Sequence, residues 1–189
     1  MSYKNNGYEI KANAIPTDLA NFLYNYLLLK REVANVVNTQ TSLLGGWTDT
    51  QVPDTYSHYA DIAMETLLAK MLPIVEKIVG TKLLPQYTFL RIYKKGDILK
   101  KHKDRSACEI STTMFLGGDE WKIYMEGKAI DLKPGDMCVY KGCELEHWRN
   151  KFKGKDCVQV FLHYITKTKT SIRYDNRDML GLPAEWSYD

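Results

Sequence analysis

The spacing of apolar residues changes once along the chain. Up to about residue 80, apolar side chains recur every three or four positions, which is the spacing of one helix face. From Tyr87 onward they occur in short runs separated by turns that contain Gly, Pro, Asp or Lys, which is typical of strands. The pattern therefore predicts a helical N-terminal part, at about 15–80, and a strand-rich core, at about 85–165.

Two helices are expected in the N-terminal part. The first is predicted over 17–31, with Thr17 as its N-cap. The second is predicted over 58–79 and ends at Gly80, a residue type that commonly terminates helices. Pro73 lies inside the second helix and is expected to kink it or split it in two.

Six strands are expected in the core, with tight turns and no helix between them: 87–93, 109–115, 121–125, 129–132, 136–140 and 157–165. Strands this short and this closely spaced describe an antiparallel sandwich or jelly roll. The expected fold class is mainly β with helices (α+β), with a cupin-like jelly-roll core and the helices packed on one face. At 189 residues a single domain, 1–189, is expected, with a polar tail at 166–189 and a short edge strand or arm at 1–14.

Composition and charge narrow the class of protein. The chain is 44% hydrophobic and 26% charged, which is ordinary for a globular protein. Its net charge is only +3, so we interpret its densest lysines as a solvated rim and expect no nucleic-acid partner; they are Lys94, Lys95, Lys100, Lys101 and Lys103. The four cysteines lack zinc-finger spacing and are expected to be free thiols. No long apolar run or signal peptide is visible, so we expect a cytoplasmic protein without a membrane partner.

One short stretch carries candidate metal chemistry. His102 and Asp104 are separated by one residue, and in an extended segment such residues point to the same side, so both can hold one ion. His147 would have to reach the same point from another strand. Two imidazoles and one carboxylate are the ligand set of the facial triad, which holds iron(II) and leaves other coordination positions open. We therefore predict His102, Asp104 and His147 as metal ligands and as the catalytic centre.

The stretch from Tyr87 to Tyr164 resembles the double-stranded β-helix core of the iron(II)- and 2-oxoglutarate-dependent oxygenases, nearest the prolyl 4-hydroxylase-like branch. The matching segments, in order, are RIYKKGDILKKHKD (91–104), LKPGDMCVY (132–140), EHWR (146–149) and VQVFLHY (158–164).

This resemblance implies a dioxygenase that uses Fe(II), 2-oxoglutarate and O2, with ascorbate as a candidate further cofactor. It implies hydroxylation of an amino-acid side chain, most readily a prolyl residue of a peptide or protein, or of a free amino acid. It also favours His147 over His163 as the third ligand. We interpret His163 as a histidine of the core or one that supports the ligands, and His58 as structural or part of the cleft rim.

The far carboxylate of 2-oxoglutarate needs a basic partner. In the prolyl hydroxylase pattern this residue lies about ten positions after the distal histidine, where it makes charge-assisted hydrogen bonds. This chain has Cys157 there. We expect Arg149 to substitute, because strand alternation directs it to the same face as His147. Lys155 is the alternative, since a loop two residues shorter would bring it to the family position.

Two further residues are expected in the same pocket. Tyr93 is predicted to hydrogen-bond the carboxylate, and Gln159 to line the pocket. The missing basic residue leaves open a cupin-like binding or structural module without turnover. An oxygenase acting on nucleic acid is also open, although only the lysines favour it. The substrate and the oligomeric state are not predicted.

Overall fold

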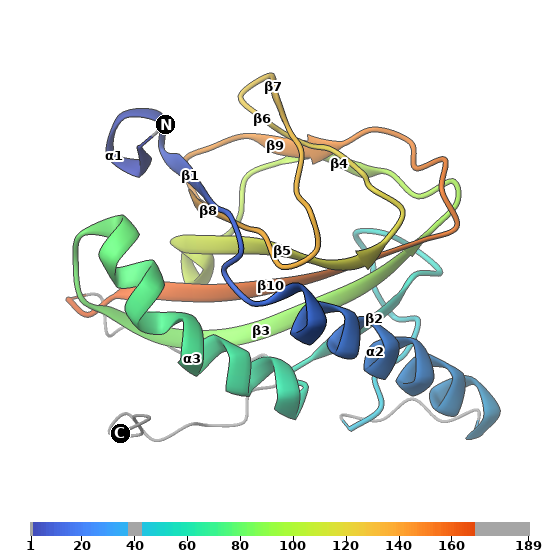
Figure 1. Cartoon of the computed structure of the whole chain (residues 1–189). Coiled ribbons are helices and arrows are strands. Elements are labelled where there is room, and N and C mark those ends of the chain that lie inside the picture. Colours follow the sequence, from blue (N-terminus) through green and yellow to red (C-terminus); the bar gives the residue numbers. More distant parts are fainter. Residues whose placement is uncertain (1, 38–42, 169–189) are drawn as a thin grey trace.

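A computed structural model describes residues 2–37 and 43–168 of the chain (Figure 1). Two antiparallel sheets face each other, and two long helices cover the outer side of the larger sheet. In spatial order, the larger sheet contains β1 (Tyr8–Lys11), β8 (Met137–Lys141), β5 (Ile110–Gly118), β10 (Asp156–Thr166), β3 (Leu83–Lys94) and β2 (Tyr56–Tyr59). The smaller sheet contains β4 (Leu99–His102), β9 (His147–Arg149), β6 (Ile123–Met125) and β7 (Lys128–Ile130). The expected jelly roll with helices on one face is confirmed.

The side chains of β10 show why the two layers form. Successive residues of a strand point to opposite faces. Val158, Val160 and Leu162 belong to the apolar cluster under the helices, whereas Cys157 and Phe161 belong to a second cluster between the sheets. The strand is buried on both faces and therefore reads as a nearly continuous apolar run. It separates the helix-facing core from the barrel interior.

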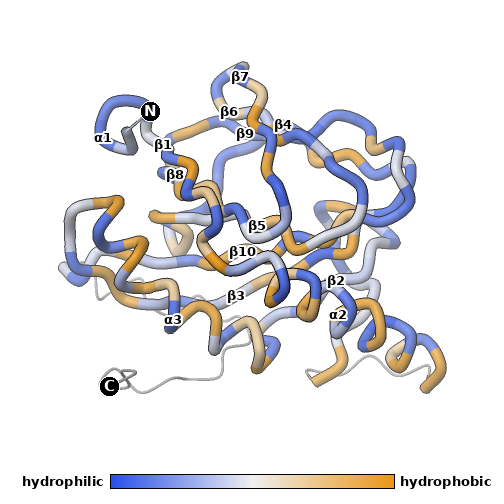
Figure 2. The backbone as a smooth tube through the Cα atoms, viewed as in Figure 1, coloured by the Kyte–Doolittle hydropathy of each residue, from blue (hydrophilic) through white to orange (hydrophobic). Residues whose placement is uncertain are grey.

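The long helices are α2 (Thr17–Val37) and α3 (Ile62–Val79), and a short helix, α1 (Tyr3–Asn6), precedes β1. Helix α2 includes Thr17 and continues past the predicted end at residue 31, because its buried face extends to Ala34. Figure 2 shows apolar positions, in orange, recurring along both long helices. No helix in the described ranges is long and apolar enough to cross a membrane.

Helix α3 starts later than predicted. The Asp61 carboxylate accepts hydrogen bonds from the backbone N–H groups of Ala63 and Met64, at 3.0 and 3.1 Å, and so caps the helix. The preceding residues, including His58, pair with β3 as strand β2. Gly80 ends the helix as expected, with φ +83°.

Pro73 does not split α3, which excludes one of the two predicted outcomes. The helix is continuous from Ile62 to Val79. Pro73 lies on its exposed side, where water can hydrogen-bond the carbonyl that loses its N–H partner.

The predicted strands are all present, with shifted ends, and β1 is the expected edge strand. Strands β4 and β9 were not among the six predicted core strands, although the ligand set required His147 to lie on a further strand. Both are short, and β4 carries Lys100, Lys101 and His102, which give no strand signal. Most of the predicted tail, 169–189, lies outside the described residues.

Candidate metal centre and adjoining pocket

The structure brings His102, Asp104 and His147 together, with their donor atoms all within 4.8 Å of one another. Strands β4 and β9 pair antiparallel and place His102 directly opposite His147. Asp104 follows β4 in an extended segment and presents Oδ1 at 3.6 Å from His102 Nε2 and 3.5 Å from His147 Nε2. Two imidazole nitrogens and a carboxylate oxygen at this spacing fit a single divalent iron.

Backbone carbonyls orient both imidazoles. His102 Nδ1 lies 2.7 Å from the carbonyl oxygen of Lys100, and His147 Nδ1 lies 3.0 Å from that of Leu145. A carbonyl can only accept, so in each neutral ring Nδ1 carries the proton. The unprotonated Nε2 of each ring then faces the centre of the cluster, as a metal ligand requires.

The second carboxylate oxygen of Asp104 is held away from the centre. Ser111 Oγ donates to Oδ2 at 2.7 Å, and the Asp104 N–H donates to the carbonyl of Gly142 at 2.8 Å. A side chain at Gly142 would come within 2.6 Å of both Asp104 Oδ2 and Ser111 Oγ, so only glycine fits there. Burial opposes ionisation of Asp104, but the two imidazoles beside it, those of His102 and His147, outweigh burial and hold its pKa well below the usual range.

His163 supports this arrangement from behind. Its Nδ1 lies 3.1 Å from Ser111 Oγ, and because that hydroxyl already donates to Asp104, the imidazole is the donor. Burial lowers the pKa of His163 to about 4, reinforced by the positive charges of Arg105 and Arg91. His163 therefore stays neutral near pH 7.

A cavity of about 320 Å³ opens over the three candidate ligands. Aromatic side chains form much of its wall, and the Tyr140 ring lies edge-on to His147 at 4.9 Å. The aromatic wall consists of Tyr59, Tyr87, Phe89, Tyr140 and Phe161. A space of this size, in which aromatic side chains and polar groups converge, suits small-molecule chemistry.

Arg149 lies on the same strand as His147 but is not among the residues that line this cavity. Its side chain is only 1% exposed. Nη1 donates to the carbonyl of Trp121 and Nη2 to Thr113 Oγ1 at 3.4 Å, while Nε has no partner. No carboxylate of the described residues forms an ion pair with this guanidinium. A buried cation with one orphan donor is the kind of site that an anionic ligand completes.

The two other predicted pocket residues lie beside Arg149. Tyr93 is fully buried, and both Arg91 and Arg149 act on it electrostatically, although burial dominates and raises the pKa of its phenol. Gln159 Oε1 accepts from Thr113 Oγ1 at 3.0 Å, and Thr113 links it to Arg149. The family position, Cys157, lies on the same inner face, where burial raises the pKa of its thiol.

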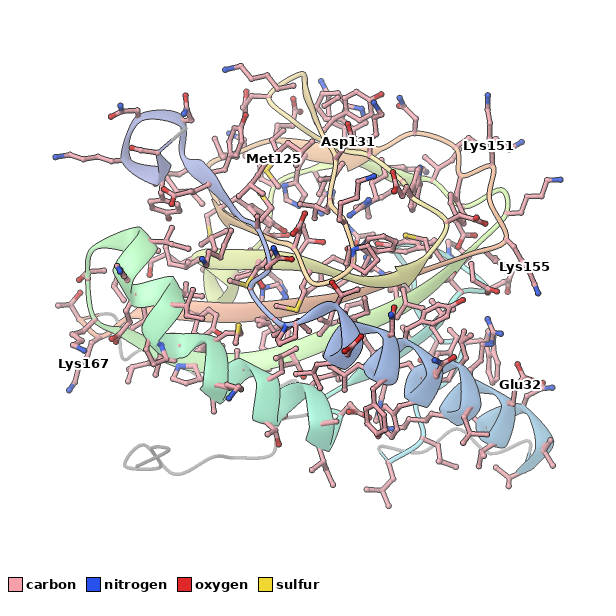
Figure 3. The ribbon with its side chains drawn as sticks, viewed as in Figure 1. Glu32, Met125, Asp131, Lys151, Lys155 and Lys167 are labelled. Carbon is pink, nitrogen blue, oxygen red and sulfur yellow. The ribbon has the colours of Figure 1, made fainter. Side chains whose placement is uncertain are left out.

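Lys155 does not reach this pocket, which corrects the alternative assignment. Its side chain is exposed, and it lines a separate surface hollow with Lys94, Lys95 and Lys153. Figure 3 shows Lys155 at the outer edge of the barrel. Two backbone hydrogen bonds fix the loop before Lys155: the Phe152 N–H donates to the Asp97 carbonyl, and the Gly96 N–H donates to the Phe152 carbonyl. The loop therefore keeps its path, and Lys155 does not reach the family position.

Sequence reasoning missed the opposite wall of the cavity. Arg91 on β3 forms an ion pair with Asp49 and donates to Gln51 Oε1 at 2.6 Å. These contacts hold the loop after α2 at the cavity, which Asp49, Gln51 and Arg91 all line. Arg105 donates to the hydroxyl of Tyr87 on the same wall. Period-two alternation over 87–93 could have shown that Arg91 faces inward with Tyr93, but its partners are too distant in sequence to predict.

The remaining expectations concern thiols and lysines. Cys108, Cys138, Cys143 and Cys157 are thiols that form no disulfide with one another, as expected. Among the clustered lysines, Lys94 pairs with Asp97 and Lys101 with Glu146.

The chain matches no protein-family model and no curated protein sequence. Its structure resembles those of several oxygenases. A Pseudomonas putida prolyl-4-hydroxylase has a TM-score of 0.63 at 14% identity, over 87% of this chain and 95% of that one. The collagen prolyl hydroxylase of Paramecium bursaria Chlorella virus-1, solved with 2-oxoglutarate, has a TM-score of 0.62 at 12% identity, over 85% and 97%. EctD from S. alaskensis with bound iron has a TM-score of 0.68 at 13% identity, over 87% of this chain and 74% of that one. The chain thus has the fold of the 2-oxoglutarate- and iron(II)-dependent oxygenases.

Proposed function

We propose that the protein is an iron(II)- and 2-oxoglutarate-dependent dioxygenase that hydroxylates an amino-acid side chain. The observation that carries this proposal is the buried guanidinium of Arg149, which has no anionic partner among the described residues and lies on the strand that carries His147. Residues two apart on a strand are about 6.6 Å apart. A dicarboxylate that chelates the metal at one end would therefore bring its other carboxylate to Arg149.

Arg149 is a better carboxylate partner than Arg91, the other buried arginine near the cavity. Arg91 already pairs with Asp49 and lies over the Phe89 ring at 4.8 Å. A second anion there would compete with an existing ion pair. Arg149 has only neutral partners, two oxygens and the Trp121 ring at 5.2 Å, so binding of a carboxylate satisfies its charge and its orphan Nε together.

Each residue group has a distinct role in this proposal. His102, Asp104 and His147 would hold iron on one face, and Arg149, assisted by Thr113 and Tyr93, would hold and orient the cosubstrate. With oxygen, the bound iron and 2-oxoglutarate supply an oxidant for an unactivated C–H bond and release succinate and carbon dioxide. Neutral His163 keeps Asp104 in place through Ser111. The aromatic wall excludes water from the reacting groups.

The substrate would enter between the aromatic wall and the Asp49–Arg91 pair. A prolyl residue in a peptide or protein, or a free amino acid, is the proposed substrate class, and two structurally similar proteins are named as prolyl hydroxylases. The cavity volume of about 320 Å³ suits one side chain beside the cosubstrate. A binding module without turnover would need neither an open coordination position on the metal nor a buried Arg149 guanidinium without a counter-ion.

Anaerobic titration with iron(II) and then 2-oxoglutarate tests this function. The chelate gives a visible charge-transfer band, which we expect in the native protein and not in His147→Ala. Iron binding without the band would contradict the cosubstrate pocket and favour a metal-binding module. On admission of oxygen, succinate formation should require both iron and 2-oxoglutarate.

A further inference from the structure

The outward side of α2 is unusually apolar for an exposed helix face. Phe22 is 67% exposed, Leu29 66% and Val36 81%, and Val33 is also exposed. The only charged residues among the exposed positions of α2 are Asp18 and Glu32. Single exposed apolar residues are normal on protein surfaces, but a concentration of them on one helix face marks an interaction site.

The spacing of these residues is that of a coiled-coil seam. Leu19, Phe22, Tyr26, Leu29, Val33 and Val36 follow one another at alternating intervals of three and four residues, which is the a/d heptad pattern. Leu19 and Tyr26 are half-buried and pack against the core, whereas Phe22, Leu29, Val33 and Val36 are exposed. The fully buried residues of α2 are Ala20, Leu23, Leu27 and Ala34. Helix α2 therefore has one apolar face in the core and a second, adjoining one that points outward.

A residue of α3 extends this outer stripe. The Asp61 carboxylate accepts hydrogen bonds from Tyr26 and Lys30 of α2, which places the start of α3 beside the middle of α2. Ile62 follows directly and is 62% exposed. We use the name outer stripe for Phe22, Leu29, Val33, Val36 and Ile62.

We propose that a second copy of this chain covers the outer stripe, with the two α2 helices antiparallel and crossing at Leu29. A two-fold interface must be complementary to itself. With Leu29 against Leu29, the large Phe22 of each copy faces the small Val36 of the other. Glu32, which lies on the outer side of α2 in Figure 3, then faces Tyr26 of the other copy and not a second Glu32. Antiparallel pairing also sets opposite helix-dipole ends beside each other.

The area available predicts a weak dimer. Fully burying side chains of this size removes roughly 60–120 Å² each from water. Since the five are already partly covered, the stripe supplies roughly 200–400 Å² of apolar surface per copy. A standard interface buries about 800 Å² per partner, somewhat over half of it apolar. The dimer should therefore form and dissociate over the micromolar concentration range.

This pairing leaves the candidate metal centre accessible, because α2 covers the outer face of β5 while the cavity lies between the sheets. The inference does not depend on the proposed function.

Sedimentation equilibrium across the micromolar range tests the proposal. We expect a monomer–dimer equilibrium in the native chain and a dissociation constant at least tenfold weaker in Leu29→Glu. An equal weakening in Val36→Lys would show that the dimer contact extends along α2 as far as residue 36. Ile10→Glu, at an exposed apolar position of edge strand β1, is the matched control and should dimerise like the native chain.

Circular dichroism and thermal unfolding establish that each variant is folded, which is expected because both positions are exposed. A Leu29→Cys variant should form an intermolecular disulfide under mild oxidation much faster than Val36→Cys, because only residue 29 faces itself. Monomers at every concentration would overturn the proposal. A dimer unaffected by both α2 variants would also overturn it and place the contact elsewhere.

Discussion

Among single residues, Arg149 combines deep burial with an incomplete set of partners. Burying an ion costs several kcal/mol unless a counter-ion compensates. In the protein without cosubstrate, Arg149 has two neutral oxygen acceptors and an unpaired Nε. This residue therefore carries an energetic cost that a bound carboxylate would remove, a pattern typical of sites kept for function at the expense of stability.

Replacing Arg149 by methionine should separate these two effects. We expect Arg149→Met to leave the free energy of unfolding unchanged or raise it by about 1–4 kcal/mol. Loss of a charge-assisted pair of about 3 kcal/mol should weaken 2-oxoglutarate binding by about a hundredfold. Urea unfolding and anaerobic titration of the cosubstrate measure the two quantities. Lys155→Met is the control and should change neither the free energy of unfolding nor 2-oxoglutarate binding. Weaker 2-oxoglutarate binding in Lys155→Met, and not in Arg149→Met, would contradict the assignment of Arg149 as the carboxylate partner.

Alternation along strands explains which single residues could be predicted. It placed Arg149 on the same face as His147, and it applies equally to Tyr93. Lys155 was proposed from loop length instead, and that argument failed because the residue precedes β10 in a loop whose path depends on contacts with Asp97. Strand alternation also could not reveal the pairing of Arg91 with Asp49, which joins two segments 42 residues apart.

At the scale of elements, Asp61 joins α2 and α3. Its carboxylate caps α3 and binds Lys30 and Tyr26 of α2 in a site where its own side chain is fully buried. Burial opposes its ionisation, but hydrogen bonds from His58, Lys30 and Tyr26 prevail and hold the pKa of Asp61 far below its usual value. The depressed pKa means that the folded state favours the carboxylate.

Asp61→Asn should therefore destabilise the protein by about 3–5 kcal/mol at pH 7, since the buried Lys30 loses its counter-ion. In the native chain this stabilisation is complete above the unfolded pKa of about 3.9 and is lost as pH falls toward the lower folded pKa. Urea unfolding from pH 7 to pH 3 measures the free energy of unfolding. Below about pH 4, this free energy should depend less on pH in Asp61→Asn than in the native chain. The control is Asp18→Asn, an exposed position in the first turn of α2, where any change should be small.

Pro73 offers a second test at this scale. Because α3 continues through it, Pro73→Ala should restore one backbone hydrogen bond and raise the free energy of unfolding by about 1–2 kcal/mol. Thermal or urea unfolding measures this change, with Lys70→Ala on the same exposed side as the control. A destabilised variant would mean that the Pro73 ring contributes packing that its exposure conceals.

Element types were predicted well where the apolar period was long and regular, as in α3 and β10. Residues 58 and 59 were assigned to the second helix because only two residues separate β2 from α3 and β2 shows no alternation of apolar and polar residues. Their strand pairing with β3 is a tertiary contact. Strands β4 and β9 gave no signal of their own, because their residues are selected for chemistry as well as for the sheet.

For the whole molecule, metal binding should stabilise the fold, since the three candidate ligands come from β9 and from β4 with the segment after it, which unfolding separates. A metal that binds only the folded state at a thousandfold excess over its dissociation constant adds about 4 kcal/mol. We expect added Mn²⁺ to raise the unfolding temperature and a chelator to reverse the increase. His147→Ala should lose most of the shift, and an equal shift in that variant would show that the metal binds elsewhere.

The strand order in space has a consequence for how the protein is made. Strand β10 comes last along the described chain, yet it lies in the middle of the larger sheet, between β5 and β3. Until Asp156–Thr166 leaves the ribosome, that sheet is two fragments, β1-β8-β5 and β3-β2, each with a hydrogen-bonding edge exposed. Contacts this distant in sequence form slowly. We therefore expect the larger sheet to remain open and prone to aggregation until β10 has left the ribosome, and then to close in one step.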